Sequence, residues 1–217
     1  TLLPKAQTPQ RGGRTPRIPD DIFIRLISDA VTWVSEIGPP LLARSSALHA
    51  IKATSRNSTA MVRRYKAFYE AEHQSVSVTV NHRDYNVNTL KRIPLRTWLN
   101  HLMSASYVLI AGLTGMRLSE ILSLRPGCLR TVPTSDGRNL LLVDGTLYKT
   151  SASDKGEPAS WIAGWDEPHN PVRLAVETLE ALHSRHGSLD PEILLFTPIP
   201  EFRGGRWSGV GLPEIRE

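Results

Sequence analysis

One cationic side chain, placed between apolar neighbours at a predicted turn, offers the clearest chemistry in this chain. Arg117 follows Thr114-Gly115 and lies three residues before Glu120. Glycine adopts backbone angles that side chains forbid, so this dipeptide predicts a tight turn with Arg117 at the start of the next helix. A guanidinium held there by packed structure can bind a phosphate through two parallel hydrogen bonds. A purely structural ion pair between Arg117 and Glu120 is the alternative interpretation.

Two predicted helices must hold this arginine in place. The helix before the turn mixes three- and four-residue spacings of its apolar residues, so it is expected to be buried around most of its circumference: Leu99, Leu102, Met103, Tyr107, Val108, Leu109 and Ile110. The short helix after the turn collects its apolar residues on one side: Leu118, Ile121, Leu122 and Leu124. The sequence therefore predicts a helix pair over about 98–125, with Arg117 near a buried corner.

The segment from Thr114 to Ile121, followed by Leu124, resembles the first arginine box of the tyrosine recombinases, also called phage-type integrases. In that family the box reads roughly T-G-x-R-x-S-E-[LI]-x-x-L, and every specified position fits here. The resemblance implies that Arg117 is the first catalytic arginine. It also implies that Glu120 is a buried support for the corner rather than an acid–base group.

Short apolar runs separated by polar residues follow the box. Residues 140–143 and 146–148 are predicted strands on either side of an Asp144-Gly145 turn, and a third strand is predicted around 160–163. We therefore expect a three-stranded antiparallel meander between about 138 and 165, packed beside the helix pair.

The resemblance also implies a catalytic lysine, which a similar small sheet presents in the tyrosine recombinases. Lys149, which precedes Thr150, resembles that lysine most closely, and Lys155 is the alternative. By this resemblance Arg117 would clamp the phosphate and Lys149 would be the general acid. Without the box, an ordinary solvated lysine at a strand end would be the better interpretation.

The N-terminal third predicts further helices. Asp20 and Asp21 suit the positive end of a helix whose apolar residues recur at helical spacing as far as Ile37. The sequence Gly38-Pro39-Pro40 is expected to stop this helix. Another helix is predicted over about 41–53.

Residues 60–72 predict a helix that carries Arg63, Arg64 and Lys66 beside aromatic residues. Such a cluster is a candidate DNA-contacting face, although a solvated helix surface over a core is the commoner arrangement. Residues 75–80 alternate polar and apolar side chains, which predicts a half-exposed strand with a hairpin partner around Tyr85. Because the family reaches its arginine box sooner, we interpret 55–93 as an insertion.

Asn170 and Pro171 predict the start of a last helix, which is expected to run to about His186. His183 and His186 lie three residues apart, but the sequence offers no further ligand nearby. We therefore predict surface histidines and no metal site.

Positive charge is concentrated in the first part of the chain. The 217 residues carry a net charge of +5, but residues 1–66 hold eleven lysines and arginines against four acidic residues. A basic first half suits a polyanion such as double-stranded DNA. Residues 1–17 are predicted to be a basic flexible arm or linker, and the candidate DNA contacts are Arg14, Arg17, Arg63, Arg64 and Lys155.

Several classes of protein are excluded by composition. Cys128 is the single cysteine, so an internal disulfide framework and a multi-cysteine zinc site are excluded. The single cysteine is consistent with a reducing cytoplasm, where we expect the protein to be located. No run of eighteen apolar residues occurs, which argues against a membrane span. The resemblance implies that no cofactor is needed, in agreement with the lack of a P-loop or zinc pattern in the sequence.

The family's second box, H-x-x-R, has no counterpart in this sequence, and no tyrosine follows Tyr148. Because these parts are missing, we interpret 18–217 as the front part of an integrase-like catalytic domain. The predicted helices and strands together indicate a mainly α fold with a small antiparallel sheet (α+β). The nucleophilic tyrosine is expected to lie outside this chain, so the chain alone should be inactive.

The resemblance implies that the full protein cleaves and rejoins DNA through a phosphotyrosine intermediate and assembles as a tetramer on DNA. Two alternatives remain open: a non-catalytic DNA-binding module, and a helical interaction domain unrelated to DNA. The second would show no salt-dependent affinity for DNA.

Overall fold

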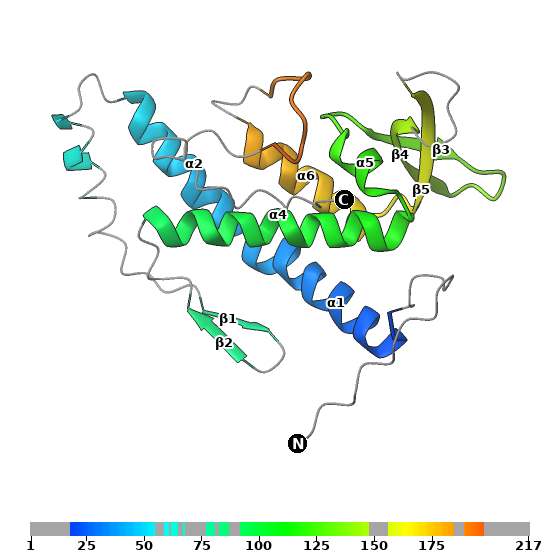
Figure 1. Cartoon of the computed structure of the whole chain (residues 1–217), viewed down its shortest axis with the longest axis horizontal. Helices are drawn as coiled ribbons and strands as arrows, with labels where there is room; N and C mark the ends of the chain where they lie inside the picture. The colour runs from blue at the N-terminus through cyan, green and yellow to red at the C-terminus, as the bar shows by residue number, and fades with distance from the viewer. Residues whose placement is uncertain are drawn as a thin grey trace, which may run out of the picture.

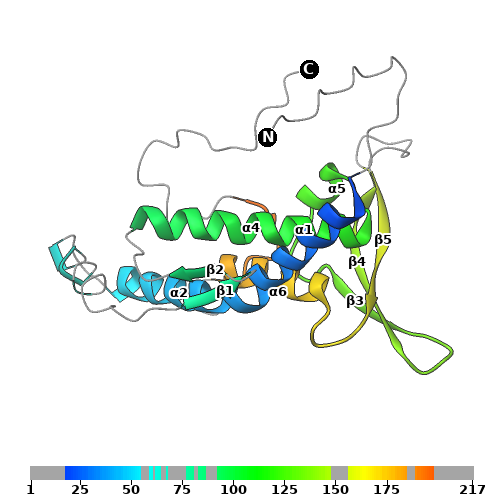
Figure 2. The ribbon, with the colours of Figure 1, turned by 90° about the horizontal axis from the view of Figure 1, so that it is seen from below.

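The computed structural model describes residues 18–54, 59–60, 62–64, 67, 77–80, 83–86, 92–147, 156–184 and 189–197. Within these ranges the fold combines helices with a three-stranded antiparallel sheet, as the α+β expectation requires. α4 lies along one side, α2 and α6 lie along the other, and the sheet stands at one end of both layers (Figure 2). No helix in these ranges is long and apolar enough to cross a bilayer.

The N-terminal helices are joined without a break, which corrects the expected stop at Gly38-Pro39-Pro40. α1 (Asp20–Thr32) passes through a wider π-helical turn, η1 (Trp33–Ile37), directly into α2 (Gly38–Thr54). Pro39 and Pro40 lie just after the wider π-helical turn and cannot donate the backbone hydrogen bonds of a regular helix, so the chain passes them by a local irregularity rather than by ending the helix. The run is nearly continuous in Figure 1.

Residues 77–86 contain a small hairpin of the predicted kind. β1 (Ser77–Val80) pairs antiparallel with β2 (Arg83–Asn86), and Val78 lies opposite Tyr85. The expected hairpin is thus present, and residues 75–76 of its predicted first strand lie outside the described residues.

The hydrophobic core is centred on α4 (Arg92–Thr114), the longest helix in the described ranges. Four of its leucines are fully buried: Leu95, Leu99, Leu102 and Leu109. The expected burial around most of its circumference is wrong, because an opposite face is exposed: Thr97, Asn100, His101 and Ser104. α1 crosses α4 at Gly112, where a Cβ would lie 2.8 Å from Cδ1 of Ile27. This close approach fixes the last turns of α4 against α1.

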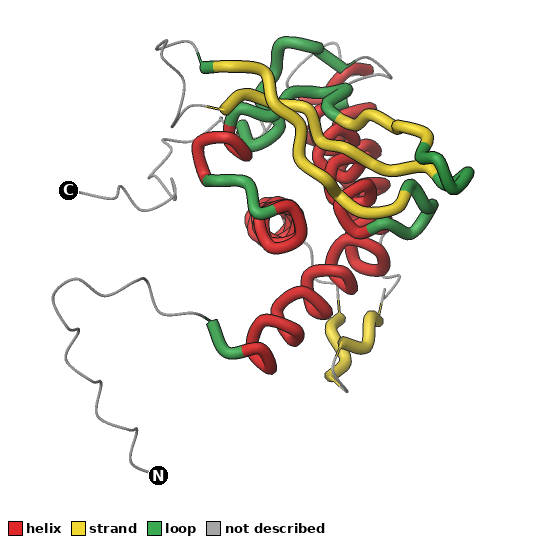
Figure 3. Tube along the Cα trace, turned by 90° about the vertical axis from the view of Figure 1, so that its right-hand side faces the viewer, coloured by secondary structure: helices red, strands yellow, loops and turns green. Residues whose placement is uncertain are grey.

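The sheet has the predicted meander topology but partly different strands. β3 (Leu129–Pro133), β4 (Asn139–Leu147) and β5 (Glu157–Trp165) pair in that order, and all pairs are antiparallel (Figure 3). The predicted turn at Asp144-Gly145 is wrong, because β4 continues through both residues. β3 was not predicted.

The last helix, α6 (Pro171–His183), begins as predicted and ends three residues early. The Asn170 side chain accepts hydrogen bonds from the N–H groups of Val172 and Arg173, which satisfies two helix-end donors. The prediction of a surface histidine is wrong for His183, which is only 5% exposed. His186 lies outside the described residues.

Candidate functional site

The bend between α4 and α5 (Leu118–Leu122) is built from three kinds of local interaction. Gly115 has a φ of 70°, a left-handed conformation that favours glycine. Its N–H donates to the carbonyl of Ala111, which closes the end of α4 at 3.2 Å. The Thr114 hydroxyl donates to the carbonyl of Ile110 at 2.6 Å and accepts the N–H of Met116 at 3.2 Å. We call residues 114–120 the arginine corner.

Arg117 and Glu120 form the polar part of the arginine corner. Arg117 has an extended backbone and occupies the N-cap of α5, and its carbonyl accepts the N–H groups of Glu120 and Ile121 at 3.0 Å. Oε2 of Glu120 accepts the backbone N–H of Arg117 at 2.7 Å. Oε1 lies 3.5 Å from Nη1 of the Arg117 guanidinium. The carboxylate therefore holds both the backbone and the side chain of Arg117.

Burial separates the roles of these two residues. Glu120 is 2% exposed, whereas the Arg117 side chain is 47% exposed. The carboxylate is thus closed off from an external reactant, while the guanidinium keeps donors at the surface for an anionic oxygen. This geometry fits the predicted support role of Glu120, and the arrangement as a whole can bind a phosphate at one defined position.

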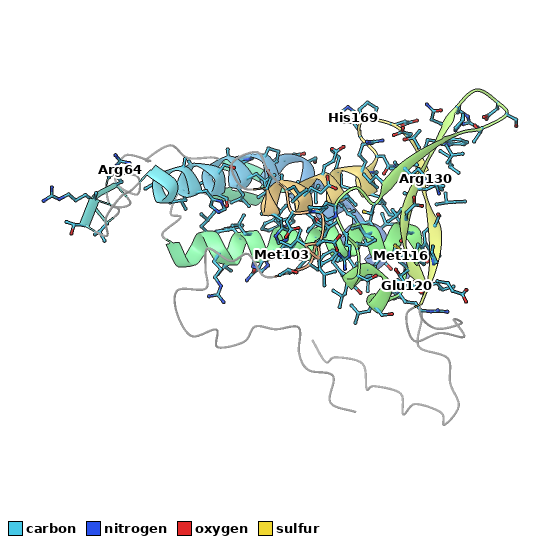
Figure 4. The ribbon with its side chains drawn as sticks, turned by 90° about the horizontal axis from the view of Figure 1, so that it is seen from above. Arg64, Met103, Met116, Glu120, Arg130 and His169 are labelled. Atoms are coloured by element: carbon cyan, nitrogen blue, oxygen red, sulfur yellow. The ribbon has the colours of Figure 1, made fainter. Side chains whose placement is uncertain are left out.

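The arginine corner packs against the middle strand of the sheet. A Cβ at Gly145 would lie 3.3 Å from the Trp161 ring, 3.4 Å from Leu124 and 3.7 Å from Met116, so residues on either side of α5 pack beside β4 at this position. Figure 4 shows Met116 and Glu120 beside one end of the sheet. At the end of the β4–β5 pairing, Leu147 lies opposite Glu157.

Both candidate lysines belong to the segment that joins these paired strand ends. Lys149 and Lys155 lie between Leu147 and Glu157 in the sequence, outside the described residues. Arg14 and Arg17 also lie outside the described residues.

The other predicted DNA contacts are remote from the arginine corner. Arg63 and Arg64 are helical and exposed, and Arg64 lies at the opposite end of the molecule from Glu120 (Figure 4). The structure therefore does not bring this basic pair together with Arg117.

Residues 192–196, which we call the return segment, contact the chain just after α5, at Leu124 and Arg125. The N–H of Leu195 donates to the carbonyl of Leu124 at 2.9 Å, and Arg125 forms an ion pair with Glu192. Nε2 of His183 lies 2.9 Å from the carbonyl oxygen of Leu195 and must carry the proton, because a carbonyl only accepts. The sequence did not predict these contacts, because they join residues that lie far apart in the chain.

A polar network crosses the three strands near the same part of β4. Nε and Nη2 of Arg130 donate to the two oxygens of Asp144 at 2.7 and 3.0 Å. The Ser160 hydroxyl donates to Asp144 at 2.5 Å and accepts from Arg130 at 3.0 Å. The hydrogen bond from Arg130 keeps the pKa of Asp144 below its ordinary value of 3.8.

Asp144 is expected to stabilise the fold at neutral pH and to lose this contribution in acid. A carboxyl whose pKa is lowered by folding stabilises above its unfolded pKa, and the contribution disappears as the pH falls through the lower, folded value. Asp144→Asn should therefore lower the urea midpoint at pH 7 and change it little at about pH 2. Urea titrations followed by circular dichroism check this, and an equal effect at both pH values would contradict it.

No other chemistry competes for the site within the described residues. No group of three or more histidine, cysteine or acidic side chains in these ranges is placed to hold a metal ion. Burial raises the pKa of Cys128 to about 12, with a further contribution from Glu180, so this thiol is not an activated nucleophile.

Comparison of the chain with protein-family models, with curated proteins and with solved structures gave no match. The chemistry of the arginine corner and its surroundings is therefore the basis for any functional conclusion.

Proposed function

We propose that this chain is the DNA-binding front part of a tyrosine-recombinase catalytic domain, in which Arg117 binds the scissile phosphate. The observation that carries the proposal is the exposed guanidinium of Arg117, held by the buried carboxylate of Glu120 at a tight bend. In an ordinary surface ion pair both side chains are exposed, whereas the Glu120 side chain is only 2% exposed. The packing of the bend on β4 supports the same proposal, because β4 leads directly to Lys149.

The proposed reaction needs an arginine that stabilises charge on the phosphate and a lysine that protonates the leaving oxygen. A tyrosine hydroxyl attacks the phosphorus of a DNA phosphodiester and releases its proton to solvent, the bond from phosphorus to the 5′ oxygen breaks, and a 3′-phosphotyrosine and a protonated 5′ oxygen result. Negative charge develops on the non-bridging oxygens, where the Arg117 fork would stabilise it. Lys149, or Lys155 in its place, would supply the proton to the leaving oxygen. The reverse attack by a 5′-hydroxyl rejoins the strands.

The charge of the chain supports double-stranded DNA as the partner. The sequence pI is about 9.6, and the net charge of residues 1–66 is +7, from eleven basic and four acidic residues. Binding of such a surface to DNA releases condensed counterions and therefore weakens as salt rises. We further propose that the complete protein assembles as a tetramer on DNA.

The chain is expected to bind duplex DNA without strong sequence preference and with a steep dependence on salt. If basic side chains contact about three to five DNA phosphates on binding, the logarithm of affinity should fall with the logarithm of salt concentration with a slope near −3 to −5. Fluorescence anisotropy of a labelled duplex in increasing potassium chloride measures the slope.

Arg117→Ala should weaken this binding and reduce the slope by about one. Arg138→Ala is the matched control, because it removes the same charge as Arg117→Ala. Arg138 lies at the β3–β4 turn, at the other end of β4 from Leu147. Absence of binding at low salt, or an affinity independent of salt, would contradict the proposed function and favour the helical interaction domain.

A further inference from the structure

The side chain of Thr114 bridges the two sides of the bend that precedes Arg117. Its hydroxyl donates back to Ile110 in the last turn of α4 and accepts from the N–H of Met116 beyond Gly115. A helical threonine commonly forms only the first of these bonds, to the carbonyl four residues earlier. The second bond ties the residue directly before Arg117 to the end of α4.

Besides Thr114, the backbone hydrogen bond from Gly115 to Ala111 and the Glu120 carboxylate restrain the bend, but side-chain packing adds little at Gly115 itself. A Cβ built on Gly115 would meet no atom within 4 Å, so packing does not hold the glycine. By contrast, α4 is fixed by α1 at Gly112, and Met116 is 5% exposed and faces Gly145. Thr114 therefore connects two anchored parts across a glycine that packing leaves free.

We infer that Thr114 is a positioning residue, whose hydroxyl sets the direction of Arg117 through the Met116 N–H. The inference rests on the proposed function for the importance of Arg117, but the two hydrogen bonds are independent of it. Thr114 does not bind the phosphate; its effect passes through the backbone of 116–117. Glu120 holds Arg117 from one side, and Thr114 fixes the bend from the other.

Two substitutions separate the hydroxyl from the shape of the side chain. Thr114→Val keeps the branched shape and removes both hydrogen bonds, while Thr114→Ser keeps the hydroxyl. Amide hydrogen exchange should accelerate at Met116 and Arg117 in the valine variant and stay near wild type in the serine variant. Unchanged protection of both amides in Thr114→Val would overturn the inference whether or not the chain binds DNA.

A double-mutant cycle then links Thr114 to Arg117 in DNA binding. We expect Thr114→Val to weaken duplex binding about three- to tenfold, Thr114→Ser to have little effect, and Thr114→Val to add nothing in the Arg117→Ala background. Additive effects, or a serine variant as weak as the valine variant, would overturn the positioning role.

Two controls keep the outcomes distinct. Thermal unfolding identifies a valine variant that fails to fold, in which case Thr114→Ala replaces it in the same cycle. If Arg117→Ala binds DNA as tightly as wild type, the proposed function fails, and the amide exchange of Met116 and Arg117 still decides whether Thr114 sets the bend.

Discussion

Arg117→Ala is expected to lower DNA cleavage roughly a thousandfold or more in the complete recombinase that we propose contains this chain. The guanidinium is preorganised by Glu120, so it meets the developing charge on the phosphate without a rearrangement. Removal of such a donor affects the transition state more than the bound substrate, and the loss should therefore appear mainly in kcat. A suicide duplex nicked beside the scissile phosphate traps the covalent adduct, and its rate of formation is the measurement.

Arg117→Lys separates the charge from the geometry of the fork. A lysine supplies a point charge but cannot form two parallel hydrogen bonds to one phosphate, so it should rescue little activity. Arg138→Ala should cleave at nearly the wild-type rate. Adduct formation by Arg117→Ala at the rate of this control would remove Arg117 from the mechanism and leave a non-catalytic DNA-binding module as the better interpretation.

Glu120→Ala is expected to cause the largest loss of stability at the site, about 2–4 kcal/mol in the free energy of unfolding. The change removes a buried side chain and leaves the N–H of Arg117 without its acceptor. Glu120→Gln should cost less, because the amide oxygen still accepts this N–H. Urea unfolding followed by circular dichroism measures the difference.

A surface glutamate provides the reference for this prediction. Glu177 pairs with Arg173 on α6 and is 51% exposed, so Glu177→Ala should change the unfolding free energy by less than about 1 kcal/mol. If Glu120→Ala were no more destabilising than Glu177→Ala, the buried carboxylate would not be what holds the arginine corner.

The arginine corner is the part of the fold that local sequence signals describe best. The spacing of apolar residues in α4 and the single glycine at the bend both act within a few residues, so they can be read without tertiary information. Local sequence alone would favour a solvated Glu120, because an acidic residue on a short helix is usually exposed. The assignment of Glu120 as a buried support came from the family resemblance. Its burial in the structure agrees with that assignment.

The parts that sequence missed depend on distant contacts. Asp144-Gly145 predicts a turn, yet β4 continues through both residues, and Leu124 and Met116 pack beside Gly145. A glycine inside a strand and a glycine in a turn give the same local sequence signal. His183 is buried, and its ring forms a hydrogen bond with the carbonyl of Leu195, twelve residues later. The residues next to His183 in the sequence do not predict that contact.

The Leu195–Leu124 hydrogen bond also has a consequence for the order of folding. It closes a chain loop of about seventy residues, which contains the whole sheet and α6. Closure of a loop this long costs little more than closure of a shorter one, but it slows the search for the native pairing. During synthesis the bend at Gly115 emerges from the ribosome well before the return segment exists. The hydrogen bond and the ion pair at Leu124 and Arg125 can therefore form only after residues 192–195 have been added.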